Sequence, residues 1–129
     1  MAYSKVNVSS PQAFCNSVLG KGYDVDGYYG YQCWDAWALC VWNLCNGASA
    51  PTKPGGGGAI DCWNVSRNYY KNLGWQLITD KSQIQYGDWL VFSGGAYGHI
   101  GMAVSNNLGN YVKLLGQNQT GSGNGSPFN

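Results

Sequence analysis

The sequence predicts an α+β fold, a compact domain in which N-terminal helices pack on a C-terminal antiparallel β-sheet. Its 129 residues match the usual length of a single domain. Apolar residues recur at helical spacing in the first half, whereas the second half holds short aliphatic and aromatic runs separated by Gly and Asn. Helices that precede strands in this order are typical of an α+β domain.

Three helices are expected in the first half of the chain. In the first, Ser10 can cap the N-terminus, Pro11 suits the first turn and Gly20 ends the pattern. The second carries Trp and other apolar residues at helical spacing up to Gly47, so we expect it to be the main buried helix. A loop rich in Gly and Pro precedes the third. The expected helices cover roughly residues 11–20, 33–46 and 60–73.

Three strands are expected after Gly74, and they cover residues 89–92, 100–104 and 111–115. The tail over residues 121–129 is mostly Gly, Ser and Asn, a composition typical of linkers. We therefore expect one folded domain over residues 1–120, followed by a flexible tail or the start of a linker over residues 121–129.

The composition excludes several classes of function. Charged residues make up 10% of the chain and the net charge is +1, so neither nucleic acid nor anionic lipid is an expected partner. All six acidic residues are Asp and His99 is the one histidine, which excludes paired-Glu glycosidases and zinc sites built on several histidines. The chain has no run of about 18 apolar residues that would span a membrane, and its first residues do not resemble a secretory signal.

A cysteine and the single histidine stand at positions that suit nucleophilic catalysis. Cys33 begins the strongest predicted helix, where the helix dipole favours a thiolate. His99 lies between glycines at the start of a predicted strand and is the one imidazole that can act as the base. A polar residue should orient the imidazole, and Asn118 is favoured over its neighbours Gln117 and Gln119.

The other four cysteines are expected to be buried as small apolar side chains. A second interpretation stays open, in which they form two disulfides and leave Cys33 as the free thiol. A structural zinc site is disfavoured because no Cys-x-x-Cys motif occurs. The four are Cys15, Cys40, Cys45 and Cys62.

An acidic loop precedes Cys33. Asp24, Asp26 and Asp35 stand at positions 1, 3 and 12 of a twelve-residue stretch, which are acidic-ligand positions of a calcium-binding loop. The carbonyls of Tyr28 and Gly30 can complete the coordination of a Ca²⁺ ion. An EF-hand is not implied, because Tyr occupies position 6 where that motif needs Gly. The alternative is a solvated turn in which Asp35 caps the first turn of the helix.

Three sequence blocks together resemble the CHAP domain of phage lysins and bacterial autolysins. They are the acidic loop through Gln32-Cys33-Trp34-Asp35, then Gly87-Asp88-Trp89, then Gly98-His99-Ile100. The resemblance extends from about residue 12 to residue 119. It implies a papain-like fold of the NlpC type and the hydrolysis of an amide bond of peptidoglycan. That bond is either N-acetylmuramoyl-L-alanine or a peptide bond of the stem or crossbridge.

The resemblance also assigns roles to residues of this chain. Cys33 is the nucleophile, His99 the base and Asn118 the orienting residue, while Gln32 joins the Cys33 N–H as a weaker oxyanion donor. Many relatives carry a glutamate two residues before the asparagine, where this chain has Gly116. One structural calcium ion, which also supports activity, is implied at Asp24, Asp26, Tyr28, Gly30 and Asp35.

Three aromatic residues near the expected site are candidates for the substrate groove, although such side chains more often serve packing. They are Tyr31, Trp34 and Tyr97. The expected partner is bacterial peptidoglycan, bound by a monomer that a separate wall-binding domain can accompany. A phage lysin of this kind would wait in the host cytoplasm before it reaches the wall. Two other interpretations are an NlpC-type peptidase, which leaves the acidic loop unexplained, and a catalytically inactive calcium- or glycan-binding wall module.

Overall fold

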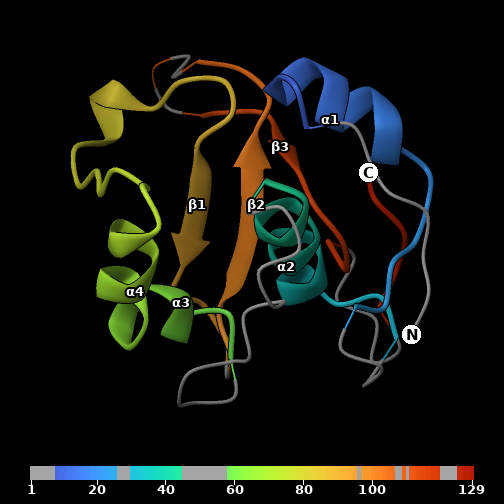
Figure 1. The fold of residues 1–129 in the computed structure, drawn as a ribbon, viewed down its shortest axis with the longest axis horizontal. Coiled ribbons are helices and arrows are strands. Elements are labelled where there is room, and N and C mark those ends of the chain that lie inside the picture. The colour runs from blue at the N-terminus through green and yellow to red at the C-terminus, as the bar shows by residue number, and fades with distance from the viewer. Residues whose placement is uncertain are drawn as a thin grey trace.

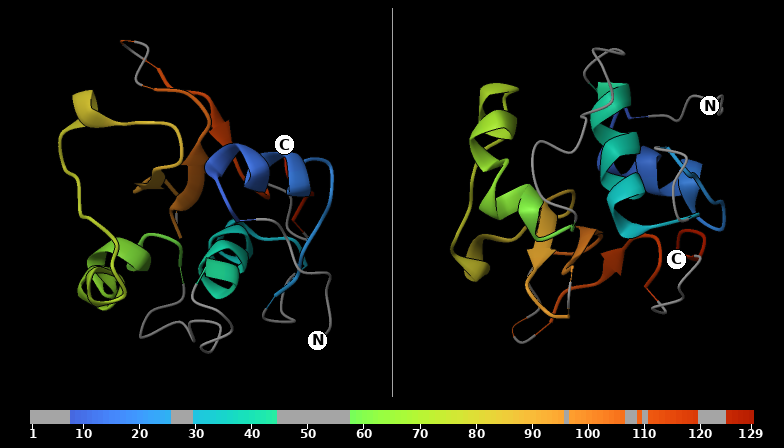
Figure 2. Two further views of the ribbon diagram at one scale, coloured as in Figure 1. Left: turned by 45° about the horizontal axis from the view of Figure 1, so that its top comes forward. Right: turned by 90° about the horizontal axis from the view of Figure 1, so that it is seen from below.

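The fold is a small antiparallel sheet with helices on one side. The computed structural model describes residues 8–25, 30–44, 58–95, 97–106, 109, 111–119 and 125–129. Figures 1 and 2 show α2 across one face of the sheet, with α1 beside it and the α3–α4 pair next to the β1 edge. The strand order is β1-β2-β3, and both pairings are antiparallel. The elements are α1 (Pro11–Val18), α2 (Cys33–Leu44), α3 (Asp61–Asn64), α4 (Arg67–Asn72), the 3-10 helix η1 (Lys81–Gln83), β1 (Trp89–Phe92), β2 (His99–Ala103) and β3 (Leu114–Leu115).

The predicted α+β class is confirmed, and so is the start of the first helix. The Ser10 side chain accepts a hydrogen bond from the Ala13 N–H at 3.0 Å, and Pro11 opens the helix. A serine cap satisfies an N–H that the first turn leaves without a partner. Gly20 follows with a φ of 79°, a conformation that glycine adopts without strain.

The second helix is buried on two sides, as predicted for the main core helix. Ala36, Leu39 and Cys40 contact a core cluster with Phe14 from α1 and Met102 from β2. The opposite side of α2 carries Trp37, Ala38 and Val41, which pack in a second cluster with Ile100 of β2, Cys62 of α3 and Tyr70 of α4. Burial on both sides explains why α2 reads as almost continuously apolar. The predicted end at residue 46 lies outside the described residues.

The third predicted helix is two short helices. The N–H groups of Val65 and Ser66 both donate to the Asp61 carbonyl, so one turn is widened and α3 ends there. On a continuous helix Cys62 and Tyr70 would point about 80° apart. The break between α3 and α4 lets both side chains be buried against the same face of α2.

The strands fall close to their predicted positions. Strand β1 matches its prediction, β2 begins one residue earlier at His99, and β3 is limited to Leu114–Leu115. The third strand is shorter than expected because the Lys113 N–H donates to the Ser105 hydroxyl at 3.0 Å rather than to a strand partner. In the β1–β2 register, His99 pairs with Phe92.

The C-terminal segment over residues 125–129 is part of the folded domain, so the prediction of a linker does not hold for it. Phe128 is 2% exposed, and its ring lies edge-on to the rings of Phe14 and Tyr23, with centroids 6.0 Å apart in both pairs. The segment also exchanges backbone hydrogen bonds with Lys21, Tyr31 and the residues after β3. Burial of one large apolar side chain and these hydrogen bonds together offset the conformational entropy that is lost when this Gly-, Ser- and Asn-rich segment becomes ordered.

Replacing Phe128 with Ala is expected to lower the free energy of unfolding by about 3–5 kcal/mol, because the change leaves a cavity in the core. Urea unfolding followed by tryptophan fluorescence measures the loss. The matched control is Pro127→Ala, since Pro127 is exposed. A loss below about 1 kcal/mol for Phe128→Ala would show that the segment does not stabilise the domain.

Candidate active site

Cys33 is the first residue of α2, and its thiol lies against strand β2. The backbone N–H groups of Ile100, Trp34 and Cys33 itself lie close to the thiol. Burial is the largest effect and raises the pKa of the thiol, the three N–H groups lower it, and the charge of Asp35 raises it. The predicted effect of the helix terminus is therefore present but smaller than that of burial. The thiol is neutral at pH 7 and needs a base to become a nucleophile.

His99 is held by a ring contact and a side-chain amide. Its ring stacks on that of Phe92 with centroids 6.2 Å apart and planes 28° apart. The His99 Nε2 and the Gln119 Oε1 are 3.0 Å apart. The Gln119 Nε2 donates to the carbonyls of Leu114 and Asn129 at 3.1 and 3.3 Å, so its oxygen must face the imidazole. The neutral ring therefore carries its proton on Nε2 and keeps Nδ1 as the basic nitrogen.

The Cys33 thiol lies next to the residue that follows His99. No hydrogen bond joins the thiol to the imidazole in the described structure. The thiol contacts the N–H of Ile100, the residue that follows His99. Ile100 faces α2. Because side chains alternate between the two faces along a strand, the His99 ring lies on the opposite face of the sheet, together with that of its cross-strand partner Phe92. Proton transfer requires the imidazole to turn about its side-chain bonds towards α2.

Asn118, predicted to orient His99, contacts Gln32 instead. Its Nδ2 donates to the Gln32 Oε1, with the two atoms 2.6 Å apart, and its backbone N–H donates to the Ser126 carbonyl. Asn118 has a φ of 53°, a left-handed conformation that Asn tolerates better than most residues. The Asn118 contact leaves the Gln32 amide with its Nε2 hydrogens as donors. Asn118 thus positions the predicted oxyanion donor, and Gln119 holds the histidine.

Gln117 is a structural residue of the site, a role that was not predicted from the sequence. It is completely buried, and its Oε1 accepts from the Tyr23 N–H at 2.7 Å. Its Nε2 donates to the carbonyls of Tyr23 and Gln32 at 2.9 and 3.0 Å. Gln117 therefore joins the start of the acidic loop and the residue before Cys33 to the end of β3. A buried amide that satisfies three backbone groups has no recognisable sequence signal, because its partners are distant in the chain.

The acidic loop is closed by Asp35, which is 1% exposed. Its two carboxylate oxygens accept from the N–H groups of Val25 and Gln32 at 3.0 and 3.1 Å, which ties the ends of the loop to the first turn of α2. Asp24 is half-buried and Gly30 has a φ of 72°. Asp26 and Tyr28 lie outside the described residues. Among the residues that are described, no three His, Cys, Asp or Glu side chains cluster as a metal site.

The candidate groove residues separate into two groups. Trp34 is 7% exposed and belongs to the core, which leaves it no surface for a substrate. Tyr31 and Tyr97 are 39% and 68% exposed. The cysteines that the structure describes are all free, and Cys40 and Cys62 are buried as predicted, while Cys15 is half-buried. Cys45 lies outside the described residues.

Cys62 provides a test of the core beside the candidate site. Burial, with a smaller contribution from the charge of Cys33, raises the pKa of the Cys62 thiol to about 12. In the unfolded chain the pKa of a thiol is about 8.5. The folded protein therefore keeps a proton that the unfolded chain loses, and this stabilisation is complete below about pH 8.5 and is lost as the pH rises towards 12.

Between about pH 8.5 and 10, the free energy of unfolding should fall by an amount that approaches 1.4 kcal/mol per pH unit from this thiol. In Cys62→Ala that part of the slope should disappear, although the variant is less stable at every pH because it loses a buried side chain. Denaturant unfolding across this pH range measures both. Equal slopes in the two proteins would contradict a buried, protonated Cys62.

Comparison with protein families identifies the chain. The family model of the CHAP domain matches residues 22–118, which include Cys33, His99 and Asn118. A comparison with curated protein sequences gave no match. In the part of the chain that the structure describes, no helix is long and apolar enough to span a membrane. The match covers most of the chain and includes the acidic loop, the cysteine and the histidine, and the chain therefore belongs to the CHAP domain family, whose members are cysteine- and histidine-dependent hydrolases of the peptidoglycan amidase and peptidase type.

Proposed function

We propose that this protein hydrolyses an amide bond of peptidoglycan with Cys33 as nucleophile, His99 as base and Gln119 as the residue that orients the imidazole. The observation that carries the proposal is the position of the thiol at the start of α2, on the N–H of the residue next to His99. Once the imidazole turns towards α2, its basic Nδ1 faces a neutral thiol, and this is the arrangement that a cysteine hydrolase requires.

The reaction follows from the chemistry of these groups. The His99 Nδ1 takes the thiol proton as the Cys33 sulfur attacks the amide carbon and forms an S–C bond. The oxygen becomes negative and receives hydrogen bonds from the Cys33 N–H and the Gln32 amide. The imidazolium then protonates the leaving nitrogen, the C–N bond breaks and a thioester remains. Water, deprotonated by His99, adds to the thioester; the C–S bond breaks and Cys33 regains its proton as the carboxylic acid product leaves.

Gln119 accounts for the missing glutamate. A Cβ built at Gly116 would lie 3.4 Å from the Cδ and Oε1 of Gln119, so a longer side chain there would enter the space beside this amide. Where many relatives have a glutamate, this chain has a glycine and an amide from three residues further on. A neutral amide oxygen accepts the Nε2 proton and orients the ring, while it stabilises the imidazolium less than a carboxylate would.

Mass spectrometry of fragments released from purified peptidoglycan tests the proposed function and identifies the bond. A new free lactyl group on muramic acid would identify an amidase, and a new peptide terminus would identify an endopeptidase. Protein that binds the wall but releases neither product would instead be the inactive wall module.

We further propose that one Ca²⁺ ion binds the acidic loop through Asp24, Asp26 and Asp35 and the carbonyls of Tyr28 and Gly30. Two observations support this donor set. Carboxylate and carbonyl oxygens are the ligands that Ca²⁺ prefers. Asp35 accepts from the N–H groups of Val25 and Gln32, so its carboxylate is held at both ends of the loop that carries the other donors. A bound cation would offset the repulsion between the aspartates and fix the loop that leads to Cys33.

Removal of calcium with a strong chelator should therefore lower both the melting temperature and the rate of wall hydrolysis, and Asp24→Ala should have the same effect without chelator. Differential scanning fluorimetry and a turbidity assay on purified walls measure the two quantities. Asp61→Ala is the matched control, because the Asp61 carboxylate bonds the Gly58 N–H outside the acidic loop, and this variant should still respond to the chelator. Unchanged melting and hydrolysis after chelation would exclude the ion.

A further inference from the structure

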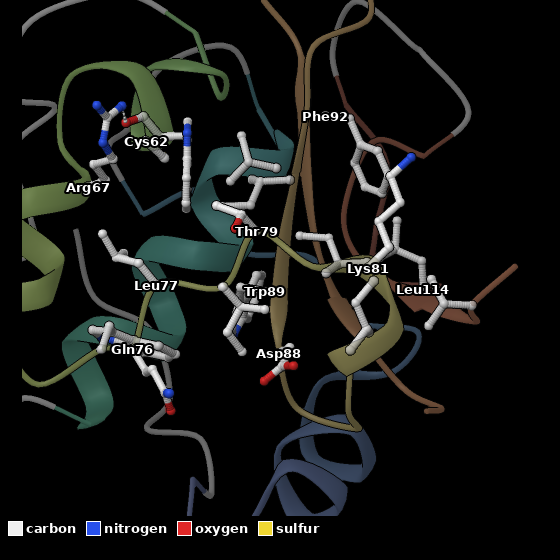
Figure 3. A pocket seen from close by; sticks show the side chains of 18 of the residues that line it. Cys62, Arg67, Gln76, Leu77, Thr79, Lys81, Asp88, Trp89, Phe92 and Leu114 are labelled. Atoms are coloured by element: carbon white, nitrogen blue, oxygen red, sulfur yellow. Dashed lines mark hydrogen bonds between the residues drawn. The ribbon is translucent and has the colours of Figure 1, made fainter. Parts of the chain in front are cut away.

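A cavity of about 780 Å³ lies beside the edge strand of the sheet. Figure 3 shows the side chains that surround it, which come from β1, from the segment over residues 75–81 and from α3 and α4. Most of the lining is apolar or aromatic. The lining includes Trp63, Arg67, Thr79, Phe92 and Ile100.

The backbone on both sides of this cavity has hydrogen-bonding capacity that is not used. Strand β1 pairs with β2 on one side. On its other side, within the part of the chain that the structure describes, β1 makes no backbone hydrogen bond, and neither does the segment over residues 76–79. Neighbouring strands lie about 4.8 Å apart, so one extended chain between these two segments can pair with either of them.

Two residues that line the cavity, one on each face of the sheet, contact the reacting groups. Phe92 lines the cavity, and its ring stacks on the ring of His99. Ile100 also lines the cavity, and its N–H contacts the Cys33 thiol. A chain held along β1 therefore extends towards the residues that would cleave it.

A cation is placed in the wall formed by α3 and α4. The guanidinium of Arg67 lies over the Trp63 ring, 5.7 Å from its centroid, and donates to the Trp63 carbonyl at 3.2 Å. No carboxylate contacts it in the described structure. A guanidinium fixed by an indole and a carbonyl still has donors that suit a carboxylate.

We propose that this cavity binds an extended wall peptide as an additional strand beside β1, with the free C-terminal carboxylate of the peptide at Arg67. The inference rests on the proposed function and adds to it that the enzyme recognises the peptide part of peptidoglycan rather than the glycan. The unused strand edge favours a peptide, because a sugar chain has no regular series of N–H and C=O groups to pair with it.

Isothermal titration calorimetry with the Cys33→Ala protein tests the proposal without any cleavage of the probe. The probes are diacetyl-L-Lys-D-Ala-D-Ala, its C-terminal amide, a backbone N-methylated version and a chitin tetrasaccharide. The peptide acid should bind, the amide about 10-fold more weakly, and the N-methylated peptide and the tetrasaccharide not measurably. Equal binding of acid and amide, or tighter binding of the tetrasaccharide, would overturn the proposal.

Substitutions locate the binding in the cavity. Arg67→Gln should weaken binding of the peptide acid about 10-fold and leave the amide unchanged. Lys71→Gln removes a cation from the same helix outside the cavity and should change neither. Thr79→Trp fills the cavity from an exposed position and should abolish peptide binding. If Arg67→Gln and Thr79→Trp bind the acid normally, the site is elsewhere.

The same variants separate this inference from the proposed function. In the background with Cys33 intact, Thr79→Trp should slow hydrolysis of purified walls at least about 10-fold. Wall hydrolysis at the normal rate by Thr79→Trp would contradict peptide binding in the cavity and leave the proposed function unaffected. If the cavity binds the peptide but the protein with Cys33 intact cleaves no amide bond, the proposed function is contradicted and the proposed binding site is retained.

Discussion

Cys33→Ala is expected to reduce the release of fragments from purified peptidoglycan by about 10⁴-fold or more, to the background rate. Loss of a nucleophile removes the covalent pathway altogether, and the remaining groups cannot replace it. The thiol lies at the start of α2 among three backbone N–H donors, a position that a methyl group occupies without disturbing the helix. Chromatography of soluble fragments from wall digests measures the rate.

The matched control for this variant is Cys15→Ala, which removes a half-buried cysteine of α1. It should keep the rate of the parent protein, and circular dichroism should show that both variants are folded. Hydrolysis by Cys33→Ala within 10-fold of the parent rate would mean that the cleavage uses another nucleophile.

His99→Ala is expected to lower the rate of hydrolysis by roughly 10²- to 10⁴-fold, the usual contribution of a general acid and base. The neutral Cys33 thiol makes this loss large, because burial raises the pKa of the thiol and only a base close by can remove its proton. The rate on purified walls, measured with the same fragment assay, reports the effect. Retention of the parent rate would exclude His99 from the reaction.

The pH dependence of the same reaction distinguishes the role of Gln119 from that of Asn118. Gln119→Glu places a carboxylate on the imidazole, so the imidazolium is stabilised and the acid limb of the profile should move to higher pH. Asn118→Asp changes the residue that contacts Gln32 and should lower the rate without moving that limb. A shift with Asn118→Asp alone would return the orienting role to Asn118.

Much of the fold could be predicted because local rules and tertiary packing agree in its main elements. The Ser10 cap, the apolar α2 and the strand at residues 89–92 each carry their own signal. The break between α3 and α4 could not be predicted, since it depends on how Cys62 and Tyr70 pack on α2. Phe128 is a single apolar residue in a polar tail, and only its partners from distant parts of the chain explain its burial.

The candidate site shows the same division. Cys33 and His99 stand out by residue type and by their places at a helix start and a strand start. The choice among Gln117, Asn118 and Gln119 could not be made from the sequence, because three adjacent amides differ only in direction. The left-handed backbone at Asn118 turns them apart, so that Gln117 enters the core, Asn118 reaches Gln32 and Gln119 reaches His99.

The central claim is that the Cys33 sulfur becomes covalently attached to the wall fragment during cleavage. Peptide mapping by mass spectrometry, on protein in excess over purified peptidoglycan and quenched in acid within milliseconds, tests this claim most directly. The predicted result is a fragment attached as a thioester to the peptide that contains Cys33, with the other four cysteines unmodified. Release of fragments while Cys33 stays unmodified at every time point, or a fragment attached to a different residue, would contradict the mechanism.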